Sequence, residues 1–348
     1  MILRFLWLLP ALMVIQCTDA PRSHNWFAMD TNMSITLYGA KGHLSDDAVF
    51  AKVDAETARL GALFTDYSTQ SGLAHVRGTM GDTLSVDPEI YGVLRTALEM
   101  GRESRGAFDI TLHDLKTLWG LDGNHQGHIP RRADLDSLMH DNTAYGLPSD
   151  SVPRPPLDFL SDRRIVIRRG DVTLDLGGIA KGYIVDRIHV LLDSLGVPNH
   201  IVQAGGDIRL GGNKKSGAWS VGIRHPRYSD SLAGTITADH AFSVSTAGDY
   251  ERFFFQDGVR YHHIFNPRTG YPVQGVSSVT VIAKTSEAAD AIDDALFVLG
   301  PKNGLYLAKK YGVEVVWFLE TSAGLCAVTT PGMSRQLTLS GVRNCPPE

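Results

Sequence analysis

The feature that most constrains this sequence is the clustering of glycine beside acidic residues at the ends of strand-like segments. Glycine contributes 35 of the 348 residues, about 10% against a typical 7% or so. Gly177-Gly178 follows Asp175 and precedes a helical pattern that begins at Ala180. Gly205-Gly206 ends a second apolar segment and leads into Asp207. Such glycines let the main chain approach a ligand closely, and a helix N-terminus favours an anion. A tight structural turn is the alternative for both clusters.

Apolar periodicity predicts an α+β fold rich in strands. Helical spacing, in places preceded by a capping residue, predicts helices over 44–63, 88–105, 112–119, 131–139, 180–195 and 286–299. Strands are predicted over 35–39, 164–168, 172–176, 201–204, 219–223, 278–283 and 313–318, and around Ile236, Phe242, Phe253 and His262. Residues 120–156 are rich in Gly, Pro, Asp and Ser, so we expect a surface excursion there rather than a linker between domains.

The N-terminus has the pattern of an export signal. Residues 5–15 carry no charge and follow Arg4, a length that suits a signal peptide and is too short to span a bilayer. Cys17 follows, as in bacterial lipoproteins, although Gln16 stands where a small residue is usual. We therefore expect a signal segment at 1–16, a single domain over 17–348, and a lipid-anchored protein on the outer face of the cytoplasmic membrane or in the periplasm. An uncleaved anchor is the alternative.

Charge and cysteine content exclude two classes of function. The 33 basic and 38 acidic side chains give a net charge of −5, so no cationic excess is available for a phosphate backbone, and we expect no nucleic-acid partner. After Cys17 only Cys326 and Cys345 remain, too few and too far apart for a zinc cluster. They could pair in an oxidising compartment; otherwise Cys326 is a core residue and Cys345 lies in a frayed end.

Three carboxylates lie on the helix predicted over 286–299. The spacing of Asp290, Asp293 and Asp294 places them on one face, where like charges repel unless a cation or solvent relieves them. Carboxylates and a nearby carbonyl are hard oxygen ligands, which suit Mg²⁺ or Ca²⁺ better than zinc. A solvated acidic face is the alternative.

Two adjacent histidines, His262 and His263, lie on a predicted strand before a turn formed by Pro267 and Gly270. Neighbouring strand residues point to opposite faces, so these two would not share one metal ion. A general base is a more natural role than a metal ligand, with one of the two histidines facing a cleft. Ser245 offers a hydroxyl, but no spacing in the sequence establishes the base and acid that a nucleophilic serine needs.

Taken together, these segments resemble the ApbE family of flavin transferases. The resemblance covers nearly the whole chain after the signal segment. It rests on five motifs in the family's order, which are Gly177 to Tyr183, Ala204 to Asp207, Ser245 to Arg252, His262 to Pro272, and Ala289 to Gly300. Five ordered motifs are far more specific than any one of them. The resemblance implies an ApbE-like, T-fold-related fold in which mixed, largely antiparallel sheets pack with helices in one compact body.

The resemblance also implies particular site residues. Contacts to FAD are carried over to Met29, Tyr67, Ala107, Phe108, Asp109, Asp175, Lys181 and Phe265. Metal ligands are carried over to Gly178, through its backbone oxygen, and to Asp290, Asp293 and Asp294. The family commonly has threonine in place of Asp294 and aspartate in place of Asn266. The extra negative charge of Asp294 could tighten a divalent cation or alter the preferred ion. Ordinary core packing is the alternative for the aromatic residues.

The implied activity is transfer of FMN from FAD to a threonine or serine of a target protein, with release of AMP and with Mg²⁺ or Ca²⁺ as the metal. His263 is the predicted base, with Asp290 as a competitor. Targets of the family carry a motif like D-x-x-[ST]-[GS]-A-[ST] and are typically subunits of membrane electron-transfer complexes. Two rival hypotheses are an exported lipoprotein that stores FAD and an enzyme that hydrolyses FAD to FMN and AMP.

Overall fold

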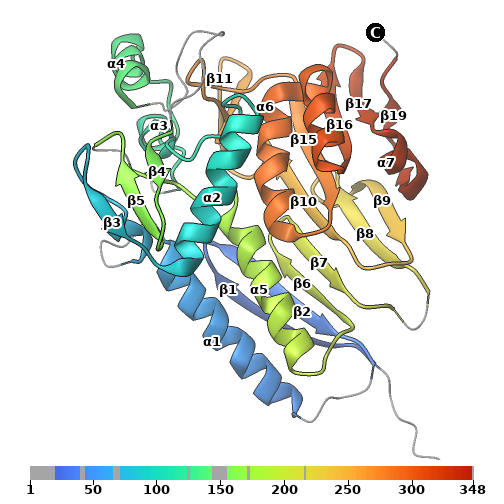
Figure 1. Ribbon diagram of the computed structural model, residues 1–348. Helices are drawn as coiled ribbons and strands as arrows, with labels where there is room; N and C mark the ends of the chain where they lie inside the picture. Colours follow the sequence, from blue (N-terminus) through green and yellow to red (C-terminus); the bar gives the residue numbers. More distant parts are fainter. Residues whose placement is uncertain are drawn as a thin grey trace, which may run out of the picture.

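A nine-stranded sheet forms the centre of the molecule (Figure 1). The computed structural model describes residues 20–39, 44–65, 71–123, 126–142, 155–170, 173–214 and 217–346. In spatial order the strands are β1 (Arg22–Ala28), β2 (Thr31–Leu37), β6 (His200–Ala204), β7 (Asp207–Gly211), β10 (Ser243–Gly248), β15 (Val276–Ala283), β16 (Glu314–Thr321), β17 (Gly324–Thr329) and β19 (Arg343–Asn344). Only the β17–β19 pair is parallel.

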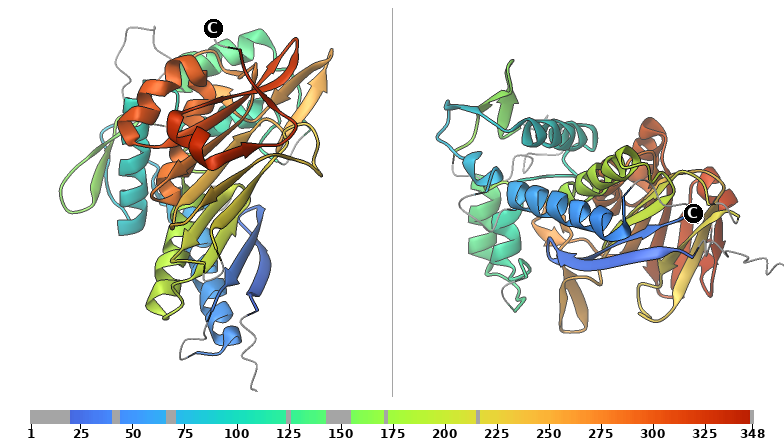
Figure 2. Two further views of the ribbon diagram at one scale, coloured as in Figure 1. Left: turned by 90° about the vertical axis from the view of Figure 1, so that its right-hand side faces the viewer. Right: turned by 90° about the horizontal axis from the view of Figure 1, so that it is seen from below.

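Three helices cover one face of this sheet: α1 (Asp46–Phe64), α5 (Ala180–Ser194) and α6 (Ser286–Tyr311), and α2 (Pro88–Glu103) packs against α6 (Figures 1 and 2). Side chains begin several of these helices. Ser45 accepts a hydrogen bond from Ala48 N at the start of α1, and Thr285 does the same for Ala288 N in α6. Because the helices and the sheet bury one continuous apolar core, α6 packs directly on the sheet, against β10 and β15.

A second, smaller sheet covers part of the opposite face. It contains β8 (Trp219–Arg224), β9 (Leu232–Ala238) and β18 (Leu337–Leu339), with α7 (Pro331–Gln336) beside it. All eight residues of β15 are buried because this strand has protein on both sides. Its Val279 and Val281 belong to the core beneath the helices, whereas Ile282 packs in the core beneath the small sheet.

The remaining elements surround one end of the large sheet. They are η1 (Leu73–His75), β3 (Thr83–Ser85), β4 (Leu157–Phe159), β5 (Arg164–Ile167), α3 (His113–Leu118), α4 (Arg132–Asn142), the hairpin β11 (Phe253–Gln256) and β12 (Val259–His262), and the short pair β13 (Phe265–Asn266) and β14 (Tyr271–Pro272). A third apolar cluster around Trp119 joins α3, α4 and β13. Within the range 120–156, α4 therefore packs on the body through Leu135.

The α+β class and the antiparallel sheets are confirmed, and most predicted elements begin and end within two or three residues of the observed ones. The strand predicted over 172–176 is wrong for its described residues, 173–176, which are not in a strand. There Asp175 N donates to Ile110 O instead of to a sheet neighbour. The helix predicted over 286–299 ends as expected at Gly300, whose φ of 64° and ψ of 176° are not helical, and a second helical segment of α6 then runs to Tyr311.

Two further findings bear on the cysteines and on membrane spans. Cys326 and Cys345 form a disulfide that ties β19 to β17. In the part of the chain that the structure describes, no helix is both long enough and apolar enough to cross a membrane. Residues 1–16 and Cys17 lie outside that part, so the signal segment and the anchor stay predictions.

Candidate active site

A cavity of about 1020 Å³ opens where α5 and α6 meet β6, β7 and β10. Eight of the residues predicted for the site line it, namely Met29, Asp175, Gly178, Lys181, His263, Asp290, Asp293 and Asp294. Four others lie outside its lining, namely Ala107, Phe108, Asp109 and Phe265. Tyr67 falls outside the described residues. Segments far apart in the sequence thus meet at one cavity.

The glycines at the cavity allow close packing of the chain. A Cβ on Gly182 would lie 2.2 Å from Ser286 O, so only glycine lets the first turn of α5 approach the start of α6. A Cβ on Gly178 would lie 2.5 Å from Asp294 Oδ2. The structural and the functional interpretations of the Gly177-Gly178 cluster therefore coincide: the turn is tight, and its tightness brings acidic side chains next to the backbone.

Lys181 lies among the acidic side chains. Its Nζ donates to Gly177 O at 2.8 Å and to Asp290 Oδ1 at 2.9 Å, and it is 3.4 Å from Asp207 Oδ2. Burial alone would lower the pKa of Lys181, but the charges of Asp207 and Asp290 outweigh burial and raise this pKa above its usual range. The lysine is therefore a fixed positive charge at one end of the acidic cluster.

Asp207 and Asp293 share one hydroxyl. Ser245 Oγ lies 2.6 Å from Asp207 Oδ1 and 2.6 Å from Asp293 Oδ2, and all three residues are buried. A serine hydroxyl has a single proton, so it can donate to only one of these carboxylates. Burial and then the charge of Asp290 raise the pKa of Asp207 to about 7. Burial and the charge of Asp294 raise the pKa of Asp293 well above its usual value.

Asp294 adds a further carboxylate to the same group. Burial and then the charge of Asp290 raise its pKa to about 6, although Lys116 and Lys181 act in the opposite direction. Asp290 itself accepts a hydrogen bond from Gly182 N through Oδ2 at 2.9 Å. We define the acidic cluster as Asp207, Asp290, Asp293 and Asp294. Among the described residues, Lys181 donates a hydrogen bond to this cluster, whereas Lys116 acts on Asp294 through space and forms its ion pair with Asp175, so the four carboxylates outnumber the nearby positive charges.

The donor set of this cluster fits a hard divalent cation. Carboxylate oxygens and a main-chain carbonyl such as that of Gly178 are the ligands that Mg²⁺ and Ca²⁺ prefer. Burial, and after it the charge of Asp290, raises the pKa values of Asp207 and Asp294, so these carboxylates are ionised at a cost in free energy. A cation would lower that cost. The assignment of Gly178, Asp290, Asp293 and Asp294 as ligands stays a prediction.

Asp175, which also lines the cavity, is held by a second cation. Lys116 Nζ forms an ion pair with Asp175 Oδ2, and Gly177 N donates to Asp175 Oδ1 at 2.8 Å. Burial raises the pKa of Asp175, but the Lys116 charge outweighs burial and lowers this pKa to about 2. Asp175 is thus ionised at every physiological pH and can accept hydrogen bonds from a ligand.

His263 lines the cavity with its ring half-buried. Its Nδ1 is buried and has no hydrogen-bond partner among the described residues. Burial and the charge of Lys116 lower the pKa of His263 to about 3, so its imidazole is neutral. The neighbouring His262 is different: its Nε2 is 2.6 Å from Val273 O, and its ring packs on Phe297 in the core. The two histidines therefore have separate environments, as predicted, but strand alternation is not the reason, because β12 ends at His262 and His263 lies in the bend that follows.

The predicted flavin contacts outside the cavity lining lie in or beside the core. Phe108 is buried behind Gly178, with a ring atom 3.2 Å from the position of a Cβ on that glycine. Asp109 Oδ1 accepts from Thr111 N at 2.8 Å, and burial raises the Asp109 pKa to about 6. Phe265 packs near Trp119, with ring centroids 5.9 Å apart. Their roles toward a flavin stay predictions.

Sequence reasoning missed several residues of the site. Asp207 ends the motif Ala204 to Asp207, but nothing in that motif predicts its contact with Ser245, and Lys116 is a lone lysine on a short helix with no distinguishing signal. Arg252 Nη2 lies 2.5 Å from Asp30 Oδ2, which links the start of the β11–β12 hairpin to the turn between β1 and β2. That turn has positive φ at both Met29 and Asp30, as tight hairpins require.

Comparison with known proteins agrees with this arrangement. The profile of the ApbE family matches residues 29–317. The FAD:protein FMN transferase of Treponema pallidum (strain Nichols) is 32% identical over 303 residues, which cover 82% of this chain and 81% of that protein. The FAD:protein FMN transferase of Vibrio cholerae is 27% identical over 85% of this chain and 86% of that protein.

Solved structures give the same result. The ApbE protein from Thermotoga maritima superposes with a TM-score of 0.79 at 30% identity, covering 91% of this chain and 99% of that one. A histidine-to-glycine variant of the flavin transferase ApbE from Vibrio cholerae superposes with a TM-score of 0.78 at 25% identity, over 91% and 99% of the two chains. Sequence profile, relatives and fold agree, and this chain belongs to the ApbE family.

Proposed function

We propose that this protein transfers the FMN part of FAD to a threonine or serine hydroxyl of a target protein and releases AMP. The observation that carries the proposal is the presence of the acidic cluster and a neutral histidine with a free ring nitrogen in one cavity. Its volume of about 1020 Å³ lies at the upper end of ordinary ligand sites, which suits a dinucleotide. The relatives named FAD:protein FMN transferase support the same reaction.

In this reaction the target oxygen forms a bond to the FMN-side phosphorus, the bond between the two phosphates breaks, and AMP leaves with the bridging oxygen. Such phosphoryl chemistry depends mainly on positioning and on neutralising charge. Gly178 O, Asp290, Asp293 and Asp294 would hold a divalent cation, Mg²⁺ or Ca²⁺, which when bound supplies positive charge beside the diphosphate. Lys181 adds a permanent positive charge at the same place.

His263 is the proposed base for the target hydroxyl. A base must be unprotonated before it accepts a proton, and the neutral imidazole of His263 meets this condition. His263 lines the cavity, so its ring can face a hydroxyl that enters there, and its buried Nδ1 is not bonded to any described residue. An anionic diphosphate nearby raises the pKa of an imidazole, so the proton is held more strongly once FAD is bound. Asp290 is the competing candidate.

We also propose that the protein is exported and acts at the outer face of the cytoplasmic membrane, anchored through a lipid on Cys17. The Cys326–Cys345 disulfide supports an oxidising compartment, since such bonds are rare in the cytosol. The proposed targets are membrane electron-transfer subunits that carry a D-x-x-[ST]-[GS]-A-[ST]-like motif. Cell fractionation of the chain and its Cys17→Ser variant tests the anchor, because only the acylated form should stay with membranes.

The transfer reaction is tested with purified protein, FAD, MgCl₂ and a target domain that carries the motif. Mass spectrometry should find the mass of FMN added to the target, together with free AMP. Free FMN and AMP without modified target would instead indicate hydrolysis, and intact FAD would indicate storage; either result contradicts transfer.

A matched pair of variants tests the acidic cluster in the same assay. Asp290→Asn should lower the transfer rate on the order of 100-fold or more, because it removes a charge from the cation site. Asp158→Asn is the control, since Asp158 forms an exposed ion pair with Arg168 outside the cavity. An unchanged rate in Asp290→Asn would remove the metal assignment.

A further inference from the structure

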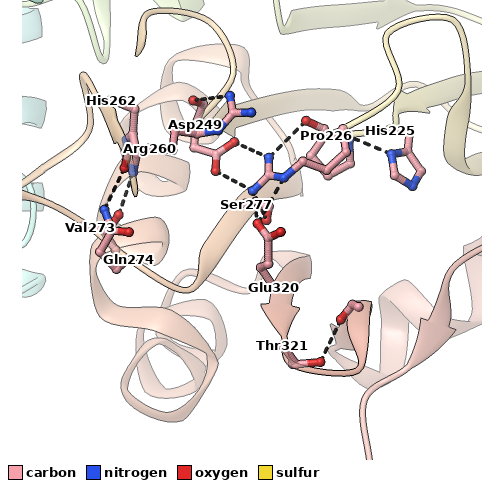
Figure 3. Close-up of polar contacts among 12 residues, drawn as sticks. His225, Pro226, Asp249, Arg260, His262, Val273, Gln274, Ser277, Glu320 and Thr321 are labelled. Carbon is pink, nitrogen blue, oxygen red and sulfur yellow. Dashed lines mark hydrogen bonds and ion pairs between the residues drawn. The ribbon is translucent and has the colours of Figure 1, made fainter. Parts of the chain in front are cut away.

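Arg227 forms the centre of a second polar network, on the turn between β8 and β9. Its guanidinium binds both oxygens of Asp249, with Nη1–Oδ1 at 2.7 Å and Nη2–Oδ2 at 2.8 Å. Nη2 also donates to Ser277 Oγ at 2.9 Å, and Nε donates to Glu320 Oε2 at 3.1 Å. Figure 3 shows Asp249, Ser277 and Glu320 converging on one point. We call Arg227, Asp249, Ser277 and Glu320 the Arg227 clamp.

The clamp joins segments that are distant in the sequence. Asp249 follows directly after β10, Ser277 lies on β15 and Glu320 lies on β16. Asp249 is 4% exposed, and its main-chain N also donates to Ser277 O at 3.0 Å. A buried carboxylate is costly unless it is paired, and two-point binding by an arginine fixes both its position and its orientation. Arg227 therefore holds the chain in place where β10 ends.

The segment that begins at Asp249 leads directly to the cavity. Tyr250, Glu251 and Arg252 line the cavity, and the β11–β12 hairpin then returns the chain to His263, which lines it again. His263 N donates to Arg252 O at 3.1 Å, so the two ends of the hairpin are joined. A displacement of Asp249 would therefore also displace Arg252 and His263.

A second contact ties the hairpin to the same residue. Arg260, on β12, points its Nη1 toward Asp249 O at 3.5 Å, and its guanidinium lies over the rings of Phe253 and Phe255 at 4.0 and 4.8 Å. Gln274 Nε2 donates to Arg260 O at 3.0 Å (Figure 3). One face of the hairpin is exposed at Phe253, Phe255 and Val259, whereas Phe254 and Tyr261 on the other face pack on the apolar cluster around Trp119. The contacts of Arg260 and Asp249 fix the end of the hairpin that this apolar packing does not reach.

We propose that Arg227 is a positioning residue for the transfer reaction. By fixing Asp249 it holds the segment from Tyr250 to His263 in the geometry that presents Arg252 and His263 to the cavity. Arg227 itself lies outside the cavity lining and acts only through Asp249. The inference rests on the proposed function, because it assigns Arg227 a role in that reaction.

The test measures FMN transfer by the full chain at saturating FAD and target, at a temperature where circular dichroism shows each variant folded. Arg227→Ala should lower kcat roughly 10- to 100-fold, because small displacements of reacting groups have effects of this size. Arg227→Lys should recover part of the loss, since lysine keeps the charge but cannot bind both carboxylate oxygens. Binding of FAD, measured by flavin fluorescence, should change much less than kcat, because Met29, Asp175 and Lys181 lie on other elements.

Hydrogen exchange of the free protein gives a second readout that does not need activity. Arg227→Ala should lose amide protection over 249–263 while the core strands keep theirs. Arg168→Ala is the control, since Arg168 forms an exposed ion pair away from the cavity, and it should keep the wild-type kcat.

The proposal is overturned if Arg227→Ala has the wild-type kcat, or if its loss of protection is spread over the whole chain. If Arg227→Ala does not fold, Arg227→Lys decides: a wild-type kcat overturns the proposal, and a reduced one supports it. If the wild-type protein itself transfers no FMN, the proposed function fails. In that case hydrogen exchange still tests the clamp: a wild-type exchange pattern in Arg227→Ala would show that Arg227 does not position residues 249–263.

Discussion

The acidic cluster and the Arg227 clamp both bury carboxylates beside a single cation, but their charges balance differently. In the clamp, one guanidinium binds the buried Asp249 and also donates to Ser277 and to Glu320, which is exposed to solvent, so the single buried carboxylate is matched by the arginine. In the acidic cluster, four carboxylates face one lysine, and one serine proton serves two of them.

The difference distinguishes a structural network from a binding site. Matched buried charges hold the backbone in one arrangement, which is the role of the clamp. Unmatched buried charges are unfavourable until something of opposite sign arrives, and perturbed pKa values therefore gather at functional sites. The high pKa values of Asp207 and Asp294 follow this rule.

The largest expected effect comes from neutralising one carboxylate in each region. Asp249→Asn should lower the free energy of unfolding by about 3 kcal/mol, because it leaves Arg227 partly unpaired. Asp294→Thr should leave it unchanged or raise it, because a repelling charge is removed. Urea denaturation of both variants in EDTA measures the difference. Equal losses in the two variants would contradict the contrast between balanced and unbalanced charge.

A second prediction concerns Lys181, whose ammonium group lies within the acidic cluster. Lys181→Met should bind Mg²⁺ roughly tenfold more tightly in the absence of FAD, because removing a positive charge next to the carboxylates favours a competing cation. Isothermal titration calorimetry measures this affinity. Lys310→Met is the matched control, since Lys310 forms an ion pair with Glu103 outside the cavity and its loss should leave the Mg²⁺ affinity unchanged. Weaker Mg²⁺ binding by Lys181→Met would show instead that the lysine orients the ligands.

The smallest expected effect is a pH dependence of the metal-free protein. Asp207 has a pKa of about 7 in the folded chain, against about 3.9 for an unperturbed aspartate. At pH 6.5 the folded chain therefore binds a proton that the unfolded chain lacks, and the free energy of unfolding falls as pH rises from 6.5 to 8. Thermal melts in EDTA should show this decrease, and Asp207→Asn should make it smaller. A slope identical in both proteins would place the titrating group elsewhere.

Local signals predicted a large part of the fold. Periodicity was sufficient for α2, α5 and the first half of α6, with Asp87 as a capping residue at the start of α2, because a helix records its buried face at fixed spacing. The strand β7 was missed because Asp207–Gly211 is short and follows a two-glycine turn. The strand expected over 172–176 is wrong for its described residues, 173–176, where Asp175 N donates to Ile110 O and not to a sheet. The local sequence pattern does not show which distant residue a main-chain group will bond to.

The residues of the candidate site could also be predicted only in part. Asp290, Asp293 and Asp294 could be selected because three carboxylates on one helix face are a local pattern. Lys116 and Ser245 could not be given their contacts, since each meets its partner only across the fold, Lys116 at Asp175 and Ser245 between Asp207 and Asp293. Nothing in the sequence distinguishes Arg227 from the other basic residues.

The sequence by itself determined the α+β class, the family resemblance and the motif residues that form the walls of the cavity, because these depend on spacing along the chain. Only the tertiary structure decided which charges are balanced. Burial makes each unpaired charge costly, and pairing depends on distances of 2.6 to 3.4 Å between segments far apart in sequence. Such contacts show that Lys181 lies within the acidic cluster, whereas Arg227 binds Asp249 and holds the hairpin.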